Sequence, residues 1–444
     1  MANWFSDGSF RAILRNASYL ASSKLGSAIL GLVALSFAGR GLTPALFGTL
    51  VVVQAYAYGV SALVKFQTWQ FIVRFGAPAL IQKDLDRFRD VTGFSFGLDL
   101  ASGAVGLIAG MALLPFISTW VGIAPKDLHL ALLYCTLIPI MTAATPTGIL
   151  RTLDRFDHIA VQQLVTPLLW AMGSGVSYFA NLGFAGFVIS WYLAELVGDL
   201  LLWFFAAREL RRQNIHRALR PALFAPARRI KGAWDFVWTT NIAHSIWSAW
   251  GPASNVIVGG LLGPSAAGLF KIASTFFEAA SKPANLMDKS FYPEIMRLHP
   301  ASKQPWLLAV RSGLLAGGVG LVVLLLVVIG GKPLIALAFG QSYVEAFDLL
   351  QIMTASLLIS MMTFPLESLL YMASKQRAAL VAEGLAALLY ALLLVMLIHS
   401  FGLVGAGIAY VCGMCLKAFF TFIPTLSAYR HRHTLSHSKD LNNG

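Results

Sequence analysis

Five lysines lie inside long apolar stretches of this sequence, where a charged group is costly: Lys24, Lys65, Lys271, Lys282 and Lys417. A charge at the centre of a bilayer costs about 2.5–3.5 kcal/mol on insertion scales. Lysine offers a compact point charge on a flexible stem, and its contacts with phosphate oxygens are strong. These residues are therefore candidates for binding an anionic group such as a diphosphate. Alternatively, those near helix ends extend to the interface, and Lys417 does so or neutralises a carboxylate.

Polar residues form stripes along single faces of the predicted helices, and two of the three stripes include the lysines named above. The stripes are Gln54, Tyr58, Ser61 and Lys65; Asn241, His244 and Ser248; and Lys271, Thr275, Glu278, Lys282 and Asn285. A polar face in a bilayer turns towards protein or a water-filled cavity, so we take Gln54, His244 and Thr275 as further candidate substrate contacts. His244 as a core histidine and Lys282 paired with Glu278 are the plainer alternatives.

Carboxylates also occur within apolar stretches. Glu195 and Asp199 are four residues apart, so a helix would place them on one face. Asp99 falls near the middle of another apolar run. Such a pair could take up a proton or a cation, and we interpret Glu195 and Asp199 as candidates for ion coupling.

The elements that would carry these residues are membrane-spanning helices. The chain of 444 residues is 57% hydrophobic and 12% charged, with a mean hydropathy of +0.70, which excludes an ordinary soluble domain. Its three cysteines lie in apolar runs and indicate neither a disulfide framework nor a metal site. Predicted helices occupy 16–38, 46–73, 88–116, 128–150, 158–181, 184–207, 233–260, 265–292, 306–338, 344–371, 377–399 and 402–427. Tight turns are expected at NLGFAG (181–186) and FGLVGAG (401–407).

The positive charge fixes an orientation for these spans. If the N-terminus is cytoplasmic, only Arg40, Lys126 and Lys332 of the 33 lysines and arginines fall on the outer side, and five fall within spans. The remainder lie in cytoplasmic segments, as the positive-inside rule requires. Both termini are therefore expected in the cytoplasm, and the net charge of +13 reflects topology, with no nucleic-acid partner.

The chain also reads as two copies of one six-helix unit. GRGLTPALFG (39–48) matches GGLLGPSAAG (259–268), LGFAGFVI (182–189) matches FGLVGAGI (401–408), and Pro146 matches Pro365. All three matches share an offset of about 220 residues, near half the chain length. We expect a six-helix lobe at 1–207, a basic linker at 208–232, a second lobe at 233–428 and a tail at 429–444. Parallel repeats of this kind bind substrate between the halves in transporters.

Four segments resemble polysaccharide flippases of the Wzx type, in the multidrug/oligosaccharidyl-lipid/polysaccharide exporter superfamily: LTPALFGTLVVVQAYAYGV, IVGGLLGPSAAGLFKIASTF, FPLESLLYMASKQR and FGLVGAGIAYV. The resemblance implies an all-α membrane protein of about twelve helices, in two pseudo-symmetric lobes around a central cavity. It also implies alternating access for a polyprenyl-diphosphate-linked oligosaccharide in a bacterial inner membrane. Expected partners are this lipid, membrane lipids, and a polysaccharide polymerase with chain-length machinery. A cation site at Asp235 and Glu383 is a further implication, although Asp235 could instead be an interfacial charge at a helix N-terminus.

Three other functions are weighed against a flippase. A multidrug exporter of the same superfamily would favour carboxylates over lysines at its centre. A membrane enzyme of polysaccharide assembly would need a sizeable external loop with acid and base groups, whereas the longest one here, GGKPLIALAFGQSYVE, has no histidine or paired carboxylates. A non-transporting scaffold would not need intramembrane charges. The sequence also lacks a P-loop, so neither ATP nor another cofactor is expected.

Overall fold

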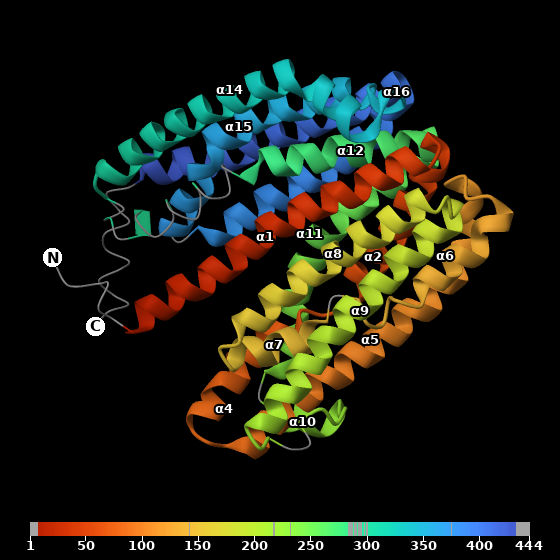
Figure 1. Ribbon diagram of the computed structural model, residues 1–444. Helices are drawn as coiled ribbons and strands as arrows, with labels where there is room; N and C mark the ends of the chain where they lie inside the picture. The colour runs from red at the N-terminus through yellow and green to blue at the C-terminus, as the bar shows by residue number, and fades with distance from the viewer. Residues whose placement is uncertain are drawn as a thin grey trace. The chain divides into compact units, whose positions relative to one another are not determined.

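The computed structural model is helical throughout the residues that it describes, which are 8–431 except 142, 216–217, 231, 374 and most of 283–300 (Figure 1). Eight described helical segments are long and apolar enough to cross a membrane. One of them, Arg377–Arg430, contains two of the predicted helices. The predicted helices 128–150, 233–260 and 265–292 correspond to shorter or less apolar described segments.

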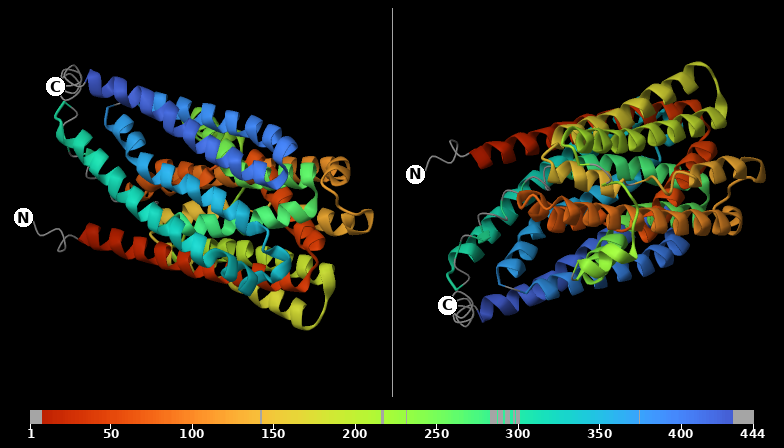
Figure 2. Two further views of the ribbon diagram at one scale, coloured as in Figure 1. Left: turned by 90° about the horizontal axis from the view of Figure 1, so that it is seen from above. Right: turned by 90° about the horizontal axis from the view of Figure 1, so that it is seen from below.

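Contacts among the described residues divide the chain into two compact units, Met1–Ala267 and Gly268–Gly444. The first unit contains α1 (Gly8–Gly41), α2 (Pro44–Val64), α5 (Leu85–Trp120), α8 (Phe156–Phe179), α9 (Gly183–Arg212) and α11 (Ala233–Leu262). Helix α8 packs between α1 and α9, and α2 packs against α11 and α5. Figure 2 shows the same neighbours in two further views. Since α11 packs against α2, it belongs to the first unit, and the lobe boundaries expected from the sequence stay a prediction.

Two predicted helices of the first unit are broken, which corrects the sequence analysis. The predicted helix 46–73 ends at Val64 and resumes as α3 (Thr68–Phe71), the π-helical turn η2 (Ile72–Gly76) and α4 (Ala77–Ile81). The predicted helix 128–150 is divided into α6 (Leu128–Cys135), which follows the short 3-10 turn η3 (Pro125–Asp127), and α7 (Ala144–Thr152). Pro139 lies in the second break, where its missing N–H and its ring oppose a continuous helix.

The predicted turns at NLGFAG and FGLVGAG are confirmed. Gly183 begins α9 with φ of 63°, and Gly402 interrupts α16 (Gln376–Arg430) with φ of 58° and ψ of −138°. Glycine adopts this left-handed region without the steric penalty that other residues meet. Helix α16 is therefore two helices joined at Gly402, in agreement with the predicted pair 377–399 and 402–427.

The second unit contains most of α12 (Pro264–Ala280), together with α14 (Gln304–Phe339), the 3-10 turn η4 (Gln341–Tyr343), α15 (Ala346–Met372) and α16. Helix α15 packs against both α14 and α16. Phe276 of α12 packs edge-on against Phe339 of α14, and Phe277 packs edge-on against Tyr410 of α16. These aromatic contacts join α12 to the other helices of its unit.

The basic linker expected at 208–232 packs against the first unit. The Thr92 hydroxyl donates to the Ala218 carbonyl, and the Arg229 guanidinium donates to both carboxylate oxygens of Asp90. A short helix, α10 (Phe224–Arg229), lies in this segment next to α5. The described part of the linker is therefore anchored along one end of α5.

Candidate functional site

Two buried charges of the first unit, Lys65 and Asp99, contact the two helix breaks. Lys65 caps α2 in an extended conformation with φ of −83° and ψ of 135°, and it is only 5% exposed. Its ammonium group donates to the carbonyls of Pro139 and Met141, each at 2.6 Å. Both carbonyls belong to the break between α6 and α7, where no continuous helix uses them. Lys65, at the first break, thus provides hydrogen bonds for two backbone carbonyls of the second break.

Asp99 makes the complementary contacts from the middle of α5. Its Oδ1 accepts a hydrogen bond from the Thr68 hydroxyl at 2.9 Å, and its Oδ2 accepts from the Thr145 backbone N–H at 3.0 Å. Thr68 and Thr145 stand in the first turns of α3 and α7. Helix N-termini carry partial positive charge and unpaired N–H groups, so a carboxylate is favourable there. Asp99 therefore stabilises the first turns of α3 and α7, where the two broken helices resume.

Lys65 and Asp99 act as one electrostatic unit. The ammonium of Lys65 interacts with the carboxylates of Asp99 and Asp199, and all three side chains are less than 8% exposed. We call the set Lys65, Thr68, Asp99 and Thr145, with the Pro139 and Met141 carbonyls, the break cluster. Burying a charge costs less when it is hydrogen-bonded and when an opposite charge acts on it, and both hold for Lys65 and Asp99.

Glu195 and Asp199 form a second buried group on α9. They are 4% and 7% exposed, one helical turn apart. The Tyr58 hydroxyl, on α2, donates to Oε1 of Glu195. On the same helix as Glu195, the Tyr192 hydroxyl lies 3.0 Å from the Thr136 hydroxyl at the end of α6. Polar contacts therefore connect α9 with both α2 and α6.

Close helix packing keeps this carboxylate pair in place. Gly198 lies between Glu195 and Asp199 in the sequence, and a Cβ there would lie 1.9 Å from the Thr166 hydroxyl oxygen of α8. Ser61, one turn before Lys65 on α2, is fully buried, and its hydroxyl has no hydrogen-bond partner among the described protein atoms. The region thus combines close helix packing with buried polar atoms, and the Ser61 hydroxyl is one of them.

Of the predicted substrate contacts, Gln54 and Lys65 lie buried in the first unit, whereas Lys24 is exposed on α1. Next to Lys24, the buried Ser23 hydroxyl donates to Oε1 of Gln163 on α8 at 2.9 Å. His244 belongs to α11, but its side chain lies outside the described residues. The structure therefore places Lys65 with the carboxylates Asp99 and Asp199, a neighbourhood that the helical stripe did not predict.

The remaining predicted contacts lie on and after α12. Lys271 is half-buried, and its carbonyl accepts a hydrogen bond from the Thr275 hydroxyl at 2.8 Å. Lys282 is exposed just beyond the end of the helix. These two lysines and Thr275 all belong to the second unit.

The predicted ion-coupling residues have different surroundings. Glu195 and Asp199 share one buried site, as described above. Asp235 is exposed in the first turn of α11, and Glu383 is partly exposed on α16. Glu383 accepts a hydrogen bond from the Lys417 ammonium at 3.3 Å, which confirms that Lys417 neutralises a carboxylate. Glu367 on α15 lies 3.9 Å from the same ammonium.

Sequence reasoning missed how Asp99 is used. Its position inside an apolar run was a visible signal, and Pro139 in the predicted helix 128–150 was a signal for the break. Nothing in the run from Val64 to Thr68 indicates that the chain leaves the helix there. Without the two breaks, Asp99 has no helix N-terminus to bind.

Comparisons with protein families and with known sequences show which proteins this chain is similar to. Residues 13–299 match the family described as "Polysaccharide biosynthesis protein". The inner membrane protein YghQ of Escherichia coli (strain K12) is 60% identical over 348 residues, which cover 78% of this chain and 98% of that protein.

Solved structures with the same fold are membrane transporters. An inward-facing multidrug resistance MATE family transporter of the MOP superfamily aligns with a TM-score of 0.70 at 14% identity, covering 92% of this chain and 96% of that one. The lipid II flippase MurJ, in an inward closed conformation, aligns with a TM-score of 0.64 at 12% identity, covering 96% and 93%. These likenesses confirm the predicted all-α, polytopic membrane fold. The match over 13–299 and the 60% identity to YghQ show that the chain belongs to the polysaccharide biosynthesis protein family.

Proposed function

We propose that this protein moves a polyprenyl-diphosphate-linked oligosaccharide from the cytoplasmic to the outer leaflet by alternating access. The family match supports a role in polysaccharide biosynthesis, and solved structures of similar fold include a flippase of lipid II. The lysines Lys24, Lys271 and Lys282, placed in or beside apolar helices, are suited to a diphosphate, which requires cationic partners in a poorly hydrated site.

The observation that carries a transport function is the amount of charge buried in the first unit. Lys65, at the end of α2, and Asp99, Glu195 and Asp199, within helices, are each less than 8% exposed in a chain similar to an inner membrane protein. Lys65 and Asp99 also stabilise the two helix breaks, but a scaffold would gain little from burying the Glu195 and Asp199 carboxylates at several kcal/mol each. Intramembrane ionisable residues usually mark ion pathways, substrate pathways or proton relays.

Glu195 and Asp199 are the residues that we assign to ion coupling. Two ionised carboxylates one turn apart repel each other strongly in a low-dielectric interior, so a bound proton or cation would stabilise the pair. Tyr58 donates to Glu195 and connects this pair to α2, the helix that leads into the first break. Uptake or release of the ion would therefore change the interactions of the pair with Tyr58 and with the charge of Lys65. Both of these residues belong to α2 or its end, so the change would act on the break cluster.

Export of glycan in cells tests the lysine assignment. Lys24→Ala and Lys271→Ala should each lower surface glycan at least ten-fold and cause lipid-linked oligosaccharide to accumulate, at unchanged protein abundance. Lys→Arg at the same positions should retain part of the activity, because the charge is kept. Lys126→Ala serves as a matched control, since this lysine lies in the short turn η3 outside the long helices. Normal export by both alanine variants would refute the assignment.

A multidrug exporter is the alternative, and the likeness to MATE transporters together with the buried carboxylate pair favours it. Such an exporter would lower the cellular content of an organic cation such as ethidium. If expression of this protein lowers ethidium content while glycan export does not depend on it, the flippase assignment is wrong.

A further inference from the structure

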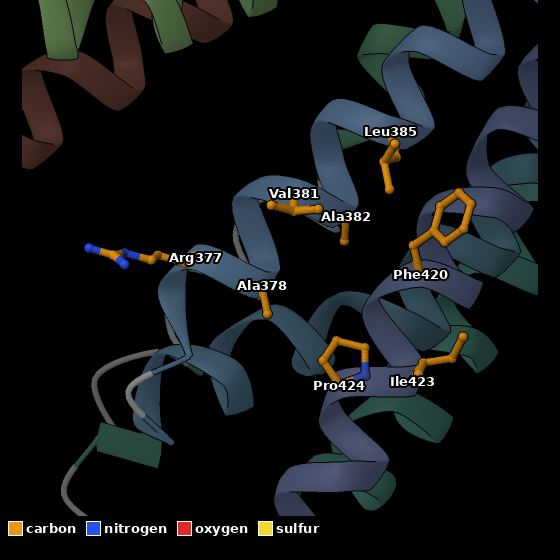
Figure 3. A pocket seen from close by; sticks show the side chains of 8 residues that line it. All are labelled: Arg377, Ala378, Val381, Ala382, Leu385, Phe420, Ile423 and Pro424. Atoms are coloured by element: carbon orange, nitrogen blue, oxygen red, sulfur yellow. The ribbon is translucent and has the colours of Figure 1, made fainter.

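A groove in the second unit has no role in the function proposed above. It runs between the two halves of α16, which pack as an antiparallel pair joined at Gly402, and it has a volume of about 380 Å³ (Figure 3). Arg377, Ala378, Val381, Ala382 and Leu385 line one side, and Phe420, Ile423 and Pro424 line the other. Arg377 is the single charged residue among these eight.

The groove faces away from the protein core. Val381, Leu385 and Ile423 on its edges are 60%, 43% and 51% exposed, whereas Ala382 on its floor is 3% exposed. Large apolar side chains therefore flank a floor of small ones, and the trough opens outwards along its length. In a chain with spans of this length, such a surface faces the hydrocarbon of the bilayer.

Arg377 lies at the end of the groove where α16 begins, and its side chain is directed away from Phe420, Ile423 and Pro424. Figure 3 shows Arg377 extending away from the row formed by Val381, Ala382 and Leu385. This is the end of the hairpin at which α16 both begins and finishes, since the Lys375 ammonium lies 3.5 Å from the Ser427 hydroxyl. A positive charge at a helix end and an apolar trough leading away from it match an amphiphile with an anionic head and a hydrocarbon tail.

We propose that the groove binds one acyl chain of an anionic phospholipid, with the phosphate diester held by Arg377. The length of the groove supports this occupant. From Arg377 to Leu385 the helix rises about 12 Å, close to the depth of one leaflet, which is about half of the 30 Å hydrocarbon core. The charge supports it too, because one guanidinium matches one phosphate diester and can bind it through two parallel hydrogen bonds.

The headgroup should determine most of the selectivity. A lipid chain leaves other lipid chains when it enters the groove, so apolar burial alone gives little gain. Attraction between one arginine and an anionic headgroup corresponds to about a five-fold preference over a zwitterionic lipid. Replacing Arg377 should therefore remove the preference for an anionic headgroup. Filling the groove at Ala382 should instead lower the binding of any phospholipid chain.

Photo-crosslinking tests the proposal with the full-length protein in phosphatidylcholine vesicles. The probes are phosphatidylglycerol and phosphatidylcholine, each with a diazirine on one acyl chain, and crosslinked peptides are mapped by mass spectrometry. We expect phosphatidylglycerol to label 378–385 and 420–424 above the remaining lipid-facing helices, about five-fold more than phosphatidylcholine does. Labelling equal to that around Leu392, which is 54% exposed on the same helix, would overturn the proposal.

Variants distinguish the binding of the phospholipid headgroup from the binding of its acyl chain. Arg377→Gln should abolish the preference for phosphatidylglycerol, while Arg430→Gln, at the same end of the hairpin but outside the lining, should preserve it. Ala382→Phe should fill the trough and lower labelling by both probes, whereas Ala391→Phe, the same enlargement at a half-buried position outside the lining, should not. Retained preference in Arg377→Gln, or displacement of the probe by polyprenyl phosphate and not by unlabelled phosphatidylglycerol, would refute a phospholipid occupant.

Discussion

At the scale of single residues, the first unit uses opposite charges to complete two interrupted helices. Lys65 donates to the carbonyls of Pro139 and Met141, and Asp99 accepts from Thr68 and Thr145. The signs agree with the polarity of the backbone, because free carbonyls attract a cation and helix N-termini attract an anion. Each charge thus has two hydrogen-bond partners and interacts electrostatically with the opposite charge, which lowers the cost of burying it.

Removing both charges of the break cluster should be less damaging than the two single removals added together. Asp99→Asn removes an anion that stabilises the Lys65 ammonium, and Lys65→Met leaves the Pro139 and Met141 carbonyls without their donor. Each should lower the free energy of unfolding by about 1–3 kcal/mol, the cost of leaving a buried polar group unsatisfied. The double variant should lose clearly less than the sum of the two. Thermal unfolding of the purified variants in one detergent measures the three effects.

The control is Asp86→Asn on the same helix, because Asp86 forms an exposed pair with Arg89 and its side chain is 91% exposed. An exposed pair contributes about 0–1 kcal/mol, so little change is expected. Strict additivity of Lys65→Met and Asp99→Asn would show that the two charges do not form one unit.

At the scale of elements, the sequence shows where helices run but not where they are interrupted. Apolar runs and the turn glycines Gly183 and Gly402 predicted most helix ends correctly, since hydropathy and left-handed turns are local signals. The break at Lys65 depends on carbonyls some seventy residues later in the chain, and no local pattern encodes that contact. For the same reason the buried carboxylate pair was visible as a spacing, whereas its link to Tyr58 was not.

The two broken helices cross at a glycine, and a methyl group there should separate them. A Cβ on Gly148 of α7 would lie 2.8 Å from the Trp69 Cα atom and 2.9 Å from the Ile72 Cβ atom. Because one of these atoms belongs to the backbone, Gly148→Ala should destabilise the protein by about 1–3 kcal/mol, as overpacking does. Gly31→Ala on α1, where a Cβ meets no atom within 4 Å, should be neutral or slightly stabilising. Thermal unfolding measures both, and equal stability of the two variants would contradict the crossing.

At the scale of the whole molecule, composition alone excluded a soluble fold, and the match over 13–299 with the likeness to transporters confirmed the membrane fold. Orientation and lobe boundaries remain predictions from charge distribution and internal repeats. The central claim is that the chain moves a lipid-linked oligosaccharide and that Glu195 and Asp199 couple this movement to an ion.

Reconstituted transport tests that claim most directly. Vesicles containing the protein and a fluorescent polyprenyl-diphosphate oligosaccharide are given a proton gradient or a sodium gradient, and a membrane-impermeant glycosidase reports the fraction of oligosaccharide in the outer leaflet. The account predicts that this fraction rises above that of protein-free vesicles under at least one gradient. The variant that combines Glu195→Gln with Asp199→Asn should lose the response to the gradient. An outer-leaflet fraction equal to that of protein-free vesicles under both gradients, with correctly folded protein, would contradict the account.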